Sequence, residues 1–465
     1  MLTNHYKDLV ERLIKEVNSP PTLSHVWELR ADLSELPKEV LSENPSLAVC
    51  MMQVLIMEGK LEEAEKALEM FPQESLMYDY ARLVLPTLHR REFRNVVEKR
   101  MKAVDETAPK LMLTAGRPSV LNGFRDFSEY GRYIKRLREP IVKACQVLYG
   151  DAATGVYEIA MAEHLYWKNE CFEALVLVVG TIPFMENLKD VRCLFAALTL
   201  EIFILVANGQ TAAVKPLIRN LRKRVDQYGS EELEHNLEAL EIWASMYDGK
   251  TEVVNQWMQE SAPDEHGDYN MLNTFGYMVK LRGYLIQEKH MALFSLAEKM
   301  KPLLKKGRRF MDLCEVMMIQ AMSFYRQGRK EQAFVILDKV INYAKRYGYD
   351  RLIGDEGGQM YRLLYEYRRE RGNDPYLTRI MDIARGMGLL YPNYLKESYT
   401  IAENITKMEK AVLRLLAEEN SNEEISEYLD ISINTVKFHV KNIYKKLSAS
   451  SRGQAVKIAK EIGFL

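Results

Sequence analysis

The chain of 465 residues has few of the features that build disulfide-rich, fibrous or disordered proteins. Its five cysteines are odd in number, lie far apart and form no CxxC pair, which argues against a disulfide framework and a zinc knuckle and fits a reducing cytoplasm. The 24 glycines and 15 prolines are too few for a long disordered segment. The 47% of hydrophobic residues instead predicts a folded chain with a large core.

An excess of one charge and long hydrophobic runs are also absent. Lysine and arginine number 64 against 65 acidic residues, so the whole chain is not a basic nucleic-acid coat, although this balance allows a local basic patch. The most apolar stretch, residues 193–207, includes Glu201 and is shorter than the ~20 residues of a membrane span. We therefore expect a buried helix there, no membrane contact and no signal peptide.

The sequence does contain helical periodicity and an internal repeat. Apolar residues recur at spacings of three and four, and good helix formers dominate, which predicts an all-α fold. A turn residue followed five positions later by a small or apolar residue occurs at Gly59, Asn169, Gly209, Gly249, Glu288 and Gly328. The last five are 40, 40, 39 and 40 residues apart, the length of a two-helix hairpin. This period predicts a helical-repeat superhelix over residues 1–387, from which the stretch around 85–140 departs.

A different organisation begins after the repeats. Residues 388–403 include Pro392, lack clear helical periodicity and are interpreted as a linker. Residues 404–465 are predicted to form a compact module of four helices, the third beginning near Ile433 and the fourth spanning about 451–462.

Helix-capping patterns define the first two helices of this module. Thr406 and Glu409 form a capping-box pattern at the start of the first helix. Asn420 is expected to end that helix in the left-handed conformation, and Asn422 is expected to cap the second helix.

The third helix separates an apolar face from a basic face. Its apolar residues fall at i, i+4, i+7 and i+11, at Val436, Val440, Ile443 and Leu447. Its lysines fall on another face, at Lys437, Lys441 and Lys445. Residues 418–430 hold six acidic and no basic residues, whereas residues 431–460 hold seven basic and no acidic ones. Charge runs are often only solvated faces, but a short helix, a tight turn and a lysine-rich helix predict a helix-turn-helix that enters the DNA major groove.

The segment SNEEISEYLDISINTVKFHVKNIYKKLSASSRGQAV resembles the LuxR-type helix-turn-helix, with counterparts of its SNxEIAxxLxIS, TVKxHV, IxxKL and SRxxAV stretches. The resemblance implies that Lys437, Phe438 and Lys441 face bases and that the fourth helix helps to pair two modules. It implies backbone-phosphate contacts for Ser432, Asn434, Thr435, Lys445, Lys446 and Arg452. Because Phe438 can contact a thymine methyl but cannot form a bidentate hydrogen bond, the target sequence of other members does not transfer.

The repeats resemble the helical-repeat region of MalT-like LuxR regulators, in residues 36–68 and in residues 307–357, which end in the family's G-Y-x-R-x-x-x-D-E-G stretch. The resemblance implies a TPR-like sensor superhelix that binds a small inducer or a regulatory protein. Full-length members also carry an N-terminal ATPase, which we expect this chain to lack. Its single GK[ST] match, residues 249–251, lies on the repeat and has Ala244 where a P-loop needs glycine, so no ATP site is predicted.

Other candidate sites favour structural interpretations. Asp355 and Glu356 between glycines suggest an acid–base pair, but adjacent residues in a loop seldom converge on one bond, and a repeat-terminating turn is favoured. The tyrosines of residues 343–367 fit helix seams better than a ligand groove. We expect no catalytic residue, cofactor or metal.

Together these features predict a sequence-specific DNA-binding transcription regulator, not an enzyme. The expectation that it activates rather than represses transcription rests on the resemblance alone. The expected partners are double-stranded DNA, a second copy in a homodimer or oligomer on DNA, RNA polymerase if the protein activates, and an unidentified small-molecule or protein effector. The expected location is the cytoplasm, associated with the nucleoid. The alternative is a protein-interaction scaffold whose C-terminal module docks a partner instead of DNA, and the charge partition favours DNA.

Overall fold

The computed structural model describes residues 6–18, 23–103, 111, 116–227, 233–267, 269–395, 406–447, 449 and 451–461. Within these ranges every regular element is a helix, as the periodicity predicts. The chain divides into two compact units, Met1–Leu395 and Lys396–Leu465, each with a hydrophobic core of its own.

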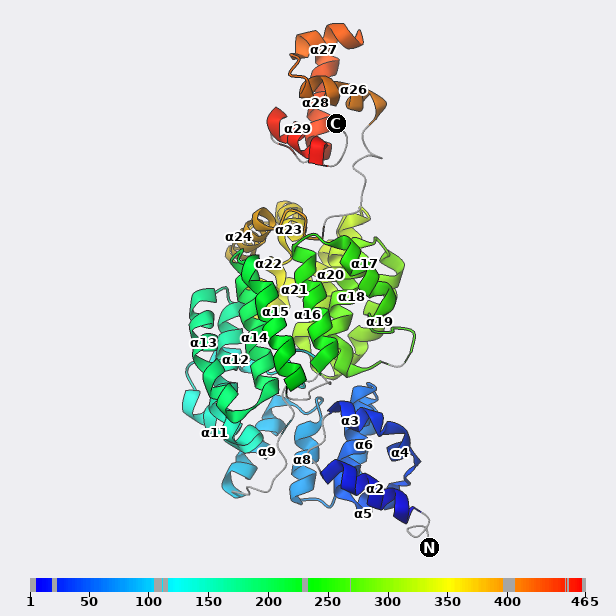
Figure 1. Ribbon diagram of the computed structural model, residues 1–465, viewed down its shortest axis with the longest axis vertical. Helices are drawn as coiled ribbons and strands as arrows, with labels where there is room; N and C mark the ends of the chain where they lie inside the picture. The colour runs from blue at the N-terminus through cyan, green and yellow to red at the C-terminus, as the bar shows by residue number, and fades with distance from the viewer. Residues whose placement is uncertain are drawn as a thin grey trace. The chain divides into compact units, whose positions relative to one another are not determined.

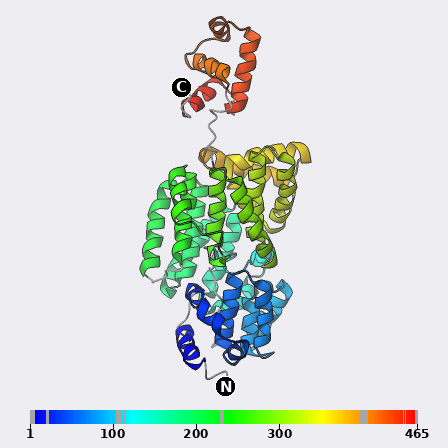
Figure 2. The same cartoon turned by 90° about the vertical axis from the view of Figure 1, so that its right-hand side faces the viewer.

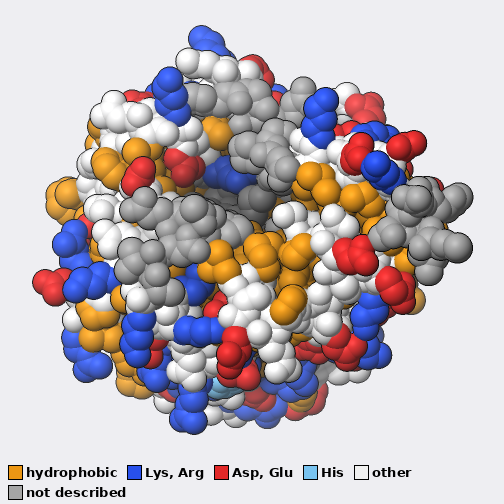
Figure 3. Space-filling view, turned by 90° about the horizontal axis from the view of Figure 1, so that it is seen from below, with side chains coloured by type: hydrophobic (Ala, Val, Ile, Leu, Met, Phe, Trp, Pro, Cys, Tyr) orange, Lys and Arg blue, Asp and Glu red, His pale blue; other side chains and the backbone are white. Residues whose placement is uncertain are grey.

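The N-terminal helices of the first unit pack around one apolar helix, α6. They are α2 (Lys7–Asn18), α3 (Leu23–Glu28), α4 (Arg30–Glu35), α5 (Lys38–Glu43), α6 (Pro45–Met57), α7 (Leu61–Lys66), α8 (Leu76–Val84) and α9 (Arg90–Ala103). Ten of the 13 residues of α6 are buried, because a helix that is apolar on all sides must lie inside. Figure 2 shows the N-terminal helices, coloured blue, gathered at one end of the first unit. Seen from below, this unit carries charged side chains of both signs around a central depression, in keeping with its balanced composition (Figure 3).

Five helical hairpins follow, as the 40-residue period predicts (Figure 1). Their helices are α12 (Ala153–Trp167) and α13 (Cys171–Leu188), α14 (Val191–Ala207) and α15 (Thr211–Gln227), α16 (Glu234–Tyr247) and α17 (Thr251–Glu260), α18 (Thr274–Ile286) and α19 (His290–Lys306), and α20 (Phe310–Arg326) and α21 (Lys330–Tyr347). The short α22 (Asp350–Gly354), α23 (Gly357–Arg371) and α24 (Pro375–Leu390) close the array.

The predicted turn residues have the backbone conformation that the repeat requires. All six have a positive φ, between 58° and 75°. The residue five positions later is buried in each case, at Ala64, Ala174, Val214, Val254, Leu293 and Ala333. Two of the turns between hairpins could not be predicted from glycine positions, because the left-handed residues there are Lys189 and Arg308, each with φ of 56°.

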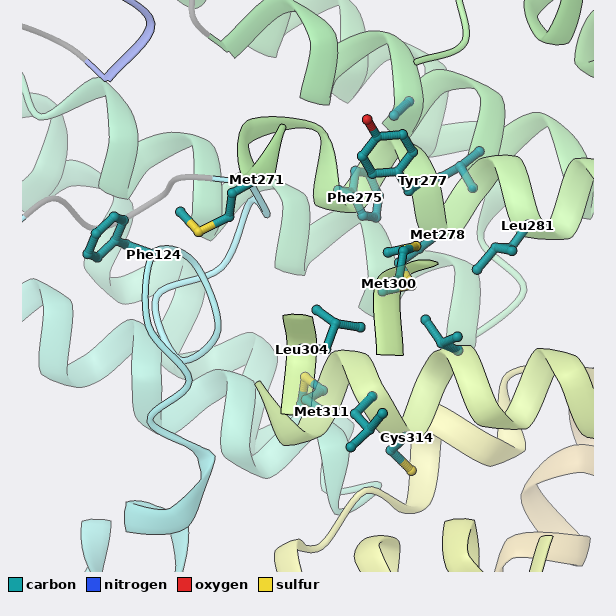
Figure 4. Packing of buried hydrophobic residues seen from close by; sticks show 14 of the residues in the cluster. Phe124, Met271, Phe275, Tyr277, Met278, Leu281, Met300, Leu304, Met311 and Cys314 are labelled. Atoms are coloured by element: carbon teal, nitrogen blue, oxygen red, sulfur yellow. The ribbon is translucent and has the colours of Figure 1, made fainter. Parts of the chain in front are cut away.

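The non-periodic stretch enters the interior of the array. Residues 116–127, here called the inner segment, are irregular and precede α10 (Gly131–Ile134) and α11 (Arg138–Tyr149). Phe124 of this segment is buried and belongs to the same hydrophobic cluster as Met271; Figure 4 labels both side chains. Gly116 has φ of 79°, and a Cβ there would lie 2.3 Å from the carbonyl oxygen of Met271, so only glycine fits.

Buried ion pairs join the inner segment to later hairpins. Arg117 Nη1 lies 2.8 Å from Asp312 Oδ1 and 2.6 Å from Glu315 Oε2, both on α20. Glu315 Oε1 lies 2.6 Å from Nη1 of Arg282 on α18, which also pairs with Glu356. Buried charges are tolerated only when paired in this way.

Asp355 and Glu356 form the turn between α22 and α23, as the sequence predicts, but both are buried. Asp355 Oδ1 lies 2.6 Å from Arg351 Nη1, and Asp355 Oδ2 accepts a hydrogen bond of 2.5 Å from the Tyr166 hydroxyl. These carboxylates therefore tie the closing helices to the rest of the array.

The array extends beyond the boundary expected from the sequence. Residues 388–395, assigned above to the linker, belong to the first unit. The Tyr391 hydroxyl donates to the carbonyl oxygen of Val206 at 2.6 Å, and the Tyr394 ring stacks on Tyr247 with centroids 4.1 Å apart. Pro392 follows the end of α24 and marks a turn rather than a free linker, since aromatic burial holds this stretch. The rest of the expected linker, up to residue 403, lies outside the described residues.

The most apolar sequence stretch forms α14, which is buried as expected. The neighbouring α13 is the one helix among the described residues that is long and apolar enough to cross a membrane by length and composition. It packs against α12 and α14 as part of the array, yet its outer face exposes Phe172, Val176, Val179, Phe184 and Leu188. The apolar sequence of α13 alone does not distinguish this exposed face from a buried one.

Candidate nucleic-acid interface

The second unit has the four helices expected from the sequence, α26 (Lys407–Ala417), α27 (Asn422–Leu429), α28 (Ile433–Leu447) and α29 (Arg452–Glu461). Val436, Ile443 and Leu447 of α28 are buried with residues of the other three helices, and Val440 is half-buried against them. The predicted apolar stripe is therefore confirmed as the side of α28 that faces the core.

The cap of α26 is as predicted, whereas the cap of α27 is not. Thr406 and Glu409 form the capping box, with Glu409 N donating to Thr406 Oγ1 at 3.2 Å and Thr406 N donating to Glu409 Oε2 at 2.7 Å. Helix α27 is capped by Ser421, not by Asn422, because Ser421 and Glu424 form a second capping box. This is the same Ser/Thr-x-x-Glu pattern.

The end of α26 also differs by one residue from the prediction. Glu419, not Asn420, is left-handed, with φ of 65°. The Asn420 side chain instead donates from Nδ2 to the carbonyl oxygen of Leu415 at 3.1 Å, which caps the helix end. The Asn420 backbone N–H donates to the same carbonyl oxygen at 3.1 Å, so asparagine terminates α26 with both its side chain and its backbone.

A tight connection orients α28 relative to α27. Asp430 is left-handed with φ of 50°, and Ser426 Oγ donates to the carbonyl oxygen of Ile431 at 2.6 Å. Ser432 Oγ accepts a hydrogen bond of 3.1 Å from Thr435 N and lies 2.8 Å from Thr435 Oγ1. Both predicted phosphate-contacting hydroxyls therefore sit at the N-terminus of α28, where free backbone N–H groups and the helix dipole favour anions.

The outer face of α28 brings together the side chains predicted to meet DNA. Asn434, Lys437, Phe438 and Lys441 are exposed, with 60% of Phe438 accessible to solvent. Neither lysine has an ion-pair partner among the described residues of the module. The side chain of Lys445 lies outside the described residues. The helix thus presents two unpaired cations and an exposed aromatic ring on the side opposite its apolar stripe.

Two further predicted phosphate contacts have partners inside the module. Lys446 Nζ lies 2.6 Å and 2.8 Å from the carboxylate oxygens of the buried Glu409. Burial acts to raise the pKa of Glu409, but hydrogen bonds from Lys446 and Thr406 outweigh it and lower that pKa. Arg452 donates from Nη2 and Nε to the carbonyl oxygen of Leu416, at 2.7 Å and 3.2 Å. These two cations fasten α28 and α29 to α26, and their phosphate contacts stay a prediction.

Comparison with known proteins identifies both regions of the chain. Residues 403–459 match the family model described as bacterial regulatory proteins of the LuxR family. The C-terminal module is a LuxR-type helix-turn-helix domain. Residues 149–370 match the model of the MalT-like TPR region, so the hairpins from α12 onward are of that type. The resemblance seen in residues 36–68 lies outside this match.

Similar regulators support the assignment of the LuxR-type domain. The transcriptional regulatory protein LiaR of Bacillus subtilis is 51% identical over 53 residues, 11% of this chain and 25% of LiaR. The probable transcriptional regulatory protein SgaR of Hyphomicrobium methylovorum is 37% identical over 81 residues, 17% and 38% of the two chains. The response regulator VraR of Staphylococcus aureus is 35% identical over 118 residues, 22% and 54%. The chain spans between a quarter and about half the length of these relatives.

The GK[ST] match at residues 249–251 is a hairpin turn. Gly249 has φ of 69° and connects α16 to α17, and Lys250 Nζ lies 2.5 Å from Asp248 Oδ2. A P-loop instead joins a strand to a helix and directs its lysine toward phosphate.

Proposed function

We propose that the protein regulates transcription by sequence-specific DNA binding rather than by catalysis, with α28 as the recognition helix. The observation that carries the proposal is the division of α28 into a buried stripe and an exposed basic face. Val436 and Ile443 are fully buried, whereas Lys437 and Lys441 are exposed. The reverse orientation would bury two unpaired charges, which is strongly unfavourable. A helix with such a face fits the B-DNA major groove, about 12 Å wide.

We assign base contacts to Lys437, Phe438 and Lys441, the exposed residues at the middle of the face. Ser432, Asn434, Thr435, Lys445, Lys446 and Arg452 are assigned to backbone phosphates. Lysine suits guanine O6 and N7, and the Phe438 ring suits a thymine methyl.

The test is the substitution Lys441→Ala, with the exposed Lys339→Ala of α21 as a charge-matched control. Binding is measured by fluorescence anisotropy to a duplex selected from genomic fragments and to a scrambled duplex. Loss of a base contact should weaken binding to the selected duplex by about 1–3 kcal/mol and reduce discrimination. Unchanged discrimination would show that α28 does not read bases. A scaffold that docks a protein would bind both duplexes equally weakly.

The array is proposed to sense a small molecule or protein and to control how the modules meet DNA. Support comes from its MalT-like TPR region and from helices that bury charged residues in one connected network. Activation through RNA polymerase rests on family resemblance alone. Paired modules would engage half-sites about 10 bp apart in the cytoplasmic nucleoid.

A second copy of the chain is the partner that we propose for the exposed face of α13. Phe172, Val176, Gly180, Phe184 and Leu188 recur at i+4 spacing along this face. Because the row is centred on Gly180, two antiparallel copies crossing there would set Phe172 against Leu188 and Val176 against Phe184. The face is therefore complementary to itself, as a twofold interface requires.

The charges near α13 fit the same arrangement. Glu173 near its start would approach Lys189 of the second copy just beyond its end, and both are exposed. An anionic membrane fits less well, since the only charges within the helix are Glu173 and Glu186. A helix face ~27 Å long and ~11 Å wide covers roughly 300 Å², below the ~800 Å² per partner of stable complexes. Pairing should thus be weak until both modules hold DNA.

A further inference from the structure

A cavity of about 130 Å³ is lined by residues of the inner segment and of α9, α11 and α12. Its walls are almost entirely apolar and include Phe93, Val97, Leu121, Ala144, Leu148 and Ala160. Among the described residues that line it, Arg94 carries the only charge, and its Nε lies 3.4 Å from a carboxylate oxygen of Glu98. Polar partners for an ordered water are therefore scarce, which disfavours ordered water against this wall and favours an apolar ligand.

We propose that this cavity is the effector site of the regulator and that its ligand is a small apolar molecule about the size of one aromatic ring. This site would give the proposed sensor role a ligand class. Ligand binding can be tested without the proposed function, whereas the effect of the ligand on DNA binding rests on it. An engineered apolar cavity of roughly 150 Å³ takes up benzene, so the volume suffices. A sugar, amino acid or nucleotide would leave its polar groups without hydrogen-bond partners.

The thiol of Cys145 does not change the apolar character of the wall. Burial raises the pKa of Cys145 to about 12, so the thiol is neutral at physiological pH. A neutral cysteine behaves as a small hydrophobic residue.

A larger and more open pocket of about 480 Å³ beside α24 is a weaker candidate for the effector site. Its cations are already neutralised within the array. Arg351 Nη1 lies 2.6 Å from Asp355, and Arg379 Nε lies 2.6 Å from Asp350. A polar ligand there would compete with ion pairs that hold the closing helices.

The cavity wall is continuous with the buried ion pairs. Val120 and Leu121 line the cavity, and their N–H groups each donate to Glu163 of α12 at 2.8 Å. The next residue, Asn122, donates from Nδ2 to Asp312 Oδ1 at 2.8 Å. A ligand that presses on the wall therefore acts on a segment bonded to both the first and the last hairpin.

From there the ion pairs lead to the C-terminal end of the array. Arg117 contacts both Asp312 and Glu315, and Glu315 contacts Arg282, as described above. Arg282 pairs with Glu356, whose Oε2 accepts a hydrogen bond of 3.1 Å from the Tyr394 hydroxyl. Tyr394 stands one residue before the end of the first unit. Ligand occupancy is thus connected, through buried charges, to the point where the chain leaves for the DNA-binding module.

The first experiment measures benzene binding to the full-length protein by calorimetry. Wild type should bind one benzene with a Kd below about 1 mM. Ala144→Phe places a ring in the cavity and should weaken binding at least roughly tenfold, whereas Ala213→Phe on the exposed face of α15 should not. Leu148→Ala, which enlarges the cavity, should bind naphthalene more tightly than wild type does, and this variant tests the site if Ala144→Phe fails to fold.

The second experiment measures the Kd for the selected duplex with and without saturating benzene. In wild type that Kd should change by about fivefold or more. Tyr394→Phe removes one hydroxyl at the exit and should keep benzene binding while abolishing this change. No benzene binding, or equal binding by Ala144→Phe, overturns the site. Benzene binding without any effect on the duplex Kd overturns the coupling. If the benzene-free wild-type protein binds the scrambled duplex as tightly as the selected duplex, the proposed function itself is refuted.

Discussion

The buried ion pairs make a quantitative prediction at Arg282. Its guanidinium is 4% exposed and serves Glu315, Glu356 and the carbonyl oxygen of Met278. In Arg282→Leu, Glu315 is still paired with Arg117, but the Glu356 side chain loses its cation. Among the described side chains, only the Tyr394 hydroxyl still donates a hydrogen bond to the Glu356 carboxylate. Stranding one buried charge in this way should lower the free energy of unfolding by about 3–5 kcal/mol. That loss is a large part of the ~5–15 kcal/mol that stabilises a typical domain.

The double variant Arg282→Leu/Glu356→Leu separates charge from packing. It removes the stranded carboxylate along with the cation, so it should regain most of the stability and lie within about 2 kcal/mol of wild type. Urea unfolding followed by tryptophan fluorescence is the assay, because the four tryptophans all lie in the array, at Trp27, Trp167, Trp243 and Trp257. A double variant no more stable than the single one would refute the charge argument and assign the loss to packing.

The pH dependence gives the same network an independent signature. Burial acts to raise the pKa of Glu315, but Arg117 and Arg282 lower it to about 2. A depressed carboxyl pKa stabilises the fold above the unfolded value and loses this effect as the pH falls through the folded value. The Glu315 contribution should therefore disappear between about pH 4.5 and 2, and Arg282→Leu should move that loss to higher pH.

Three further outcomes are expected. Burial raises the pKa of Glu163 to about 7, so the folded array holds a proton that the unfolded chain releases near pH 4.5. Array stability should fall as the pH rises from about 4.5 to 7, and urea titrations of Glu163→Gln should lack this slope. Ser421→Ala should lower the free energy of local opening of α27, measured by amide hydrogen exchange, by about 1 kcal/mol, because it removes the N-cap. Asn422→Ala should have little effect on the same measurement. In sedimentation velocity, Val176→Asp should remain monomeric at concentrations where wild type associates; association of both would remove α13 from the interface.

The fold was predictable wherever its cause is local. The hairpin period follows from left-handed turn residues such as Gly209 and Gly328, and the capping box of Thr406 and Glu409 follows from four consecutive residues. The exposed and buried faces of α28 follow from helical spacing alone. The candidate interface was therefore largely visible in the sequence. The cap at Ser421 was missed although it repeats the same pattern.

Contacts between distant residues were not predictable in this way. Arg117 and Glu315 are 198 residues apart, and neither stands out from the other charged residues of a helical chain. Their pairing depends on the inner segment, which breaks the period and carries no regular pattern. The exposed face of α13 was missed for a related reason, since an apolar helix in a sequence reads as buried unless its neighbours are known.

Contacts between distant residues also decide how many basic residues of the DNA-binding module are free to contact phosphates. Seven basic residues in residues 431–460 suggest as many phosphate contacts, yet Lys446 neutralises Glu409 and Arg452 caps α26. Each phosphate neutralised contributes about 0.9 to the salt slope. Arg452 keeps its charge, but the charge of Lys446 is balanced by Glu409 even where Lys446 also contacts a phosphate, so the slope per module should fall about 0.9 below the value that the count implies. A single module then has too few contacts for a typical specific affinity of about 10⁻⁸ M or tighter, because the remaining cations must both position the helix and read bases. We therefore propose that stable binding needs two modules on one duplex, and the weak pairing proposed for α13 would serve to bring them together.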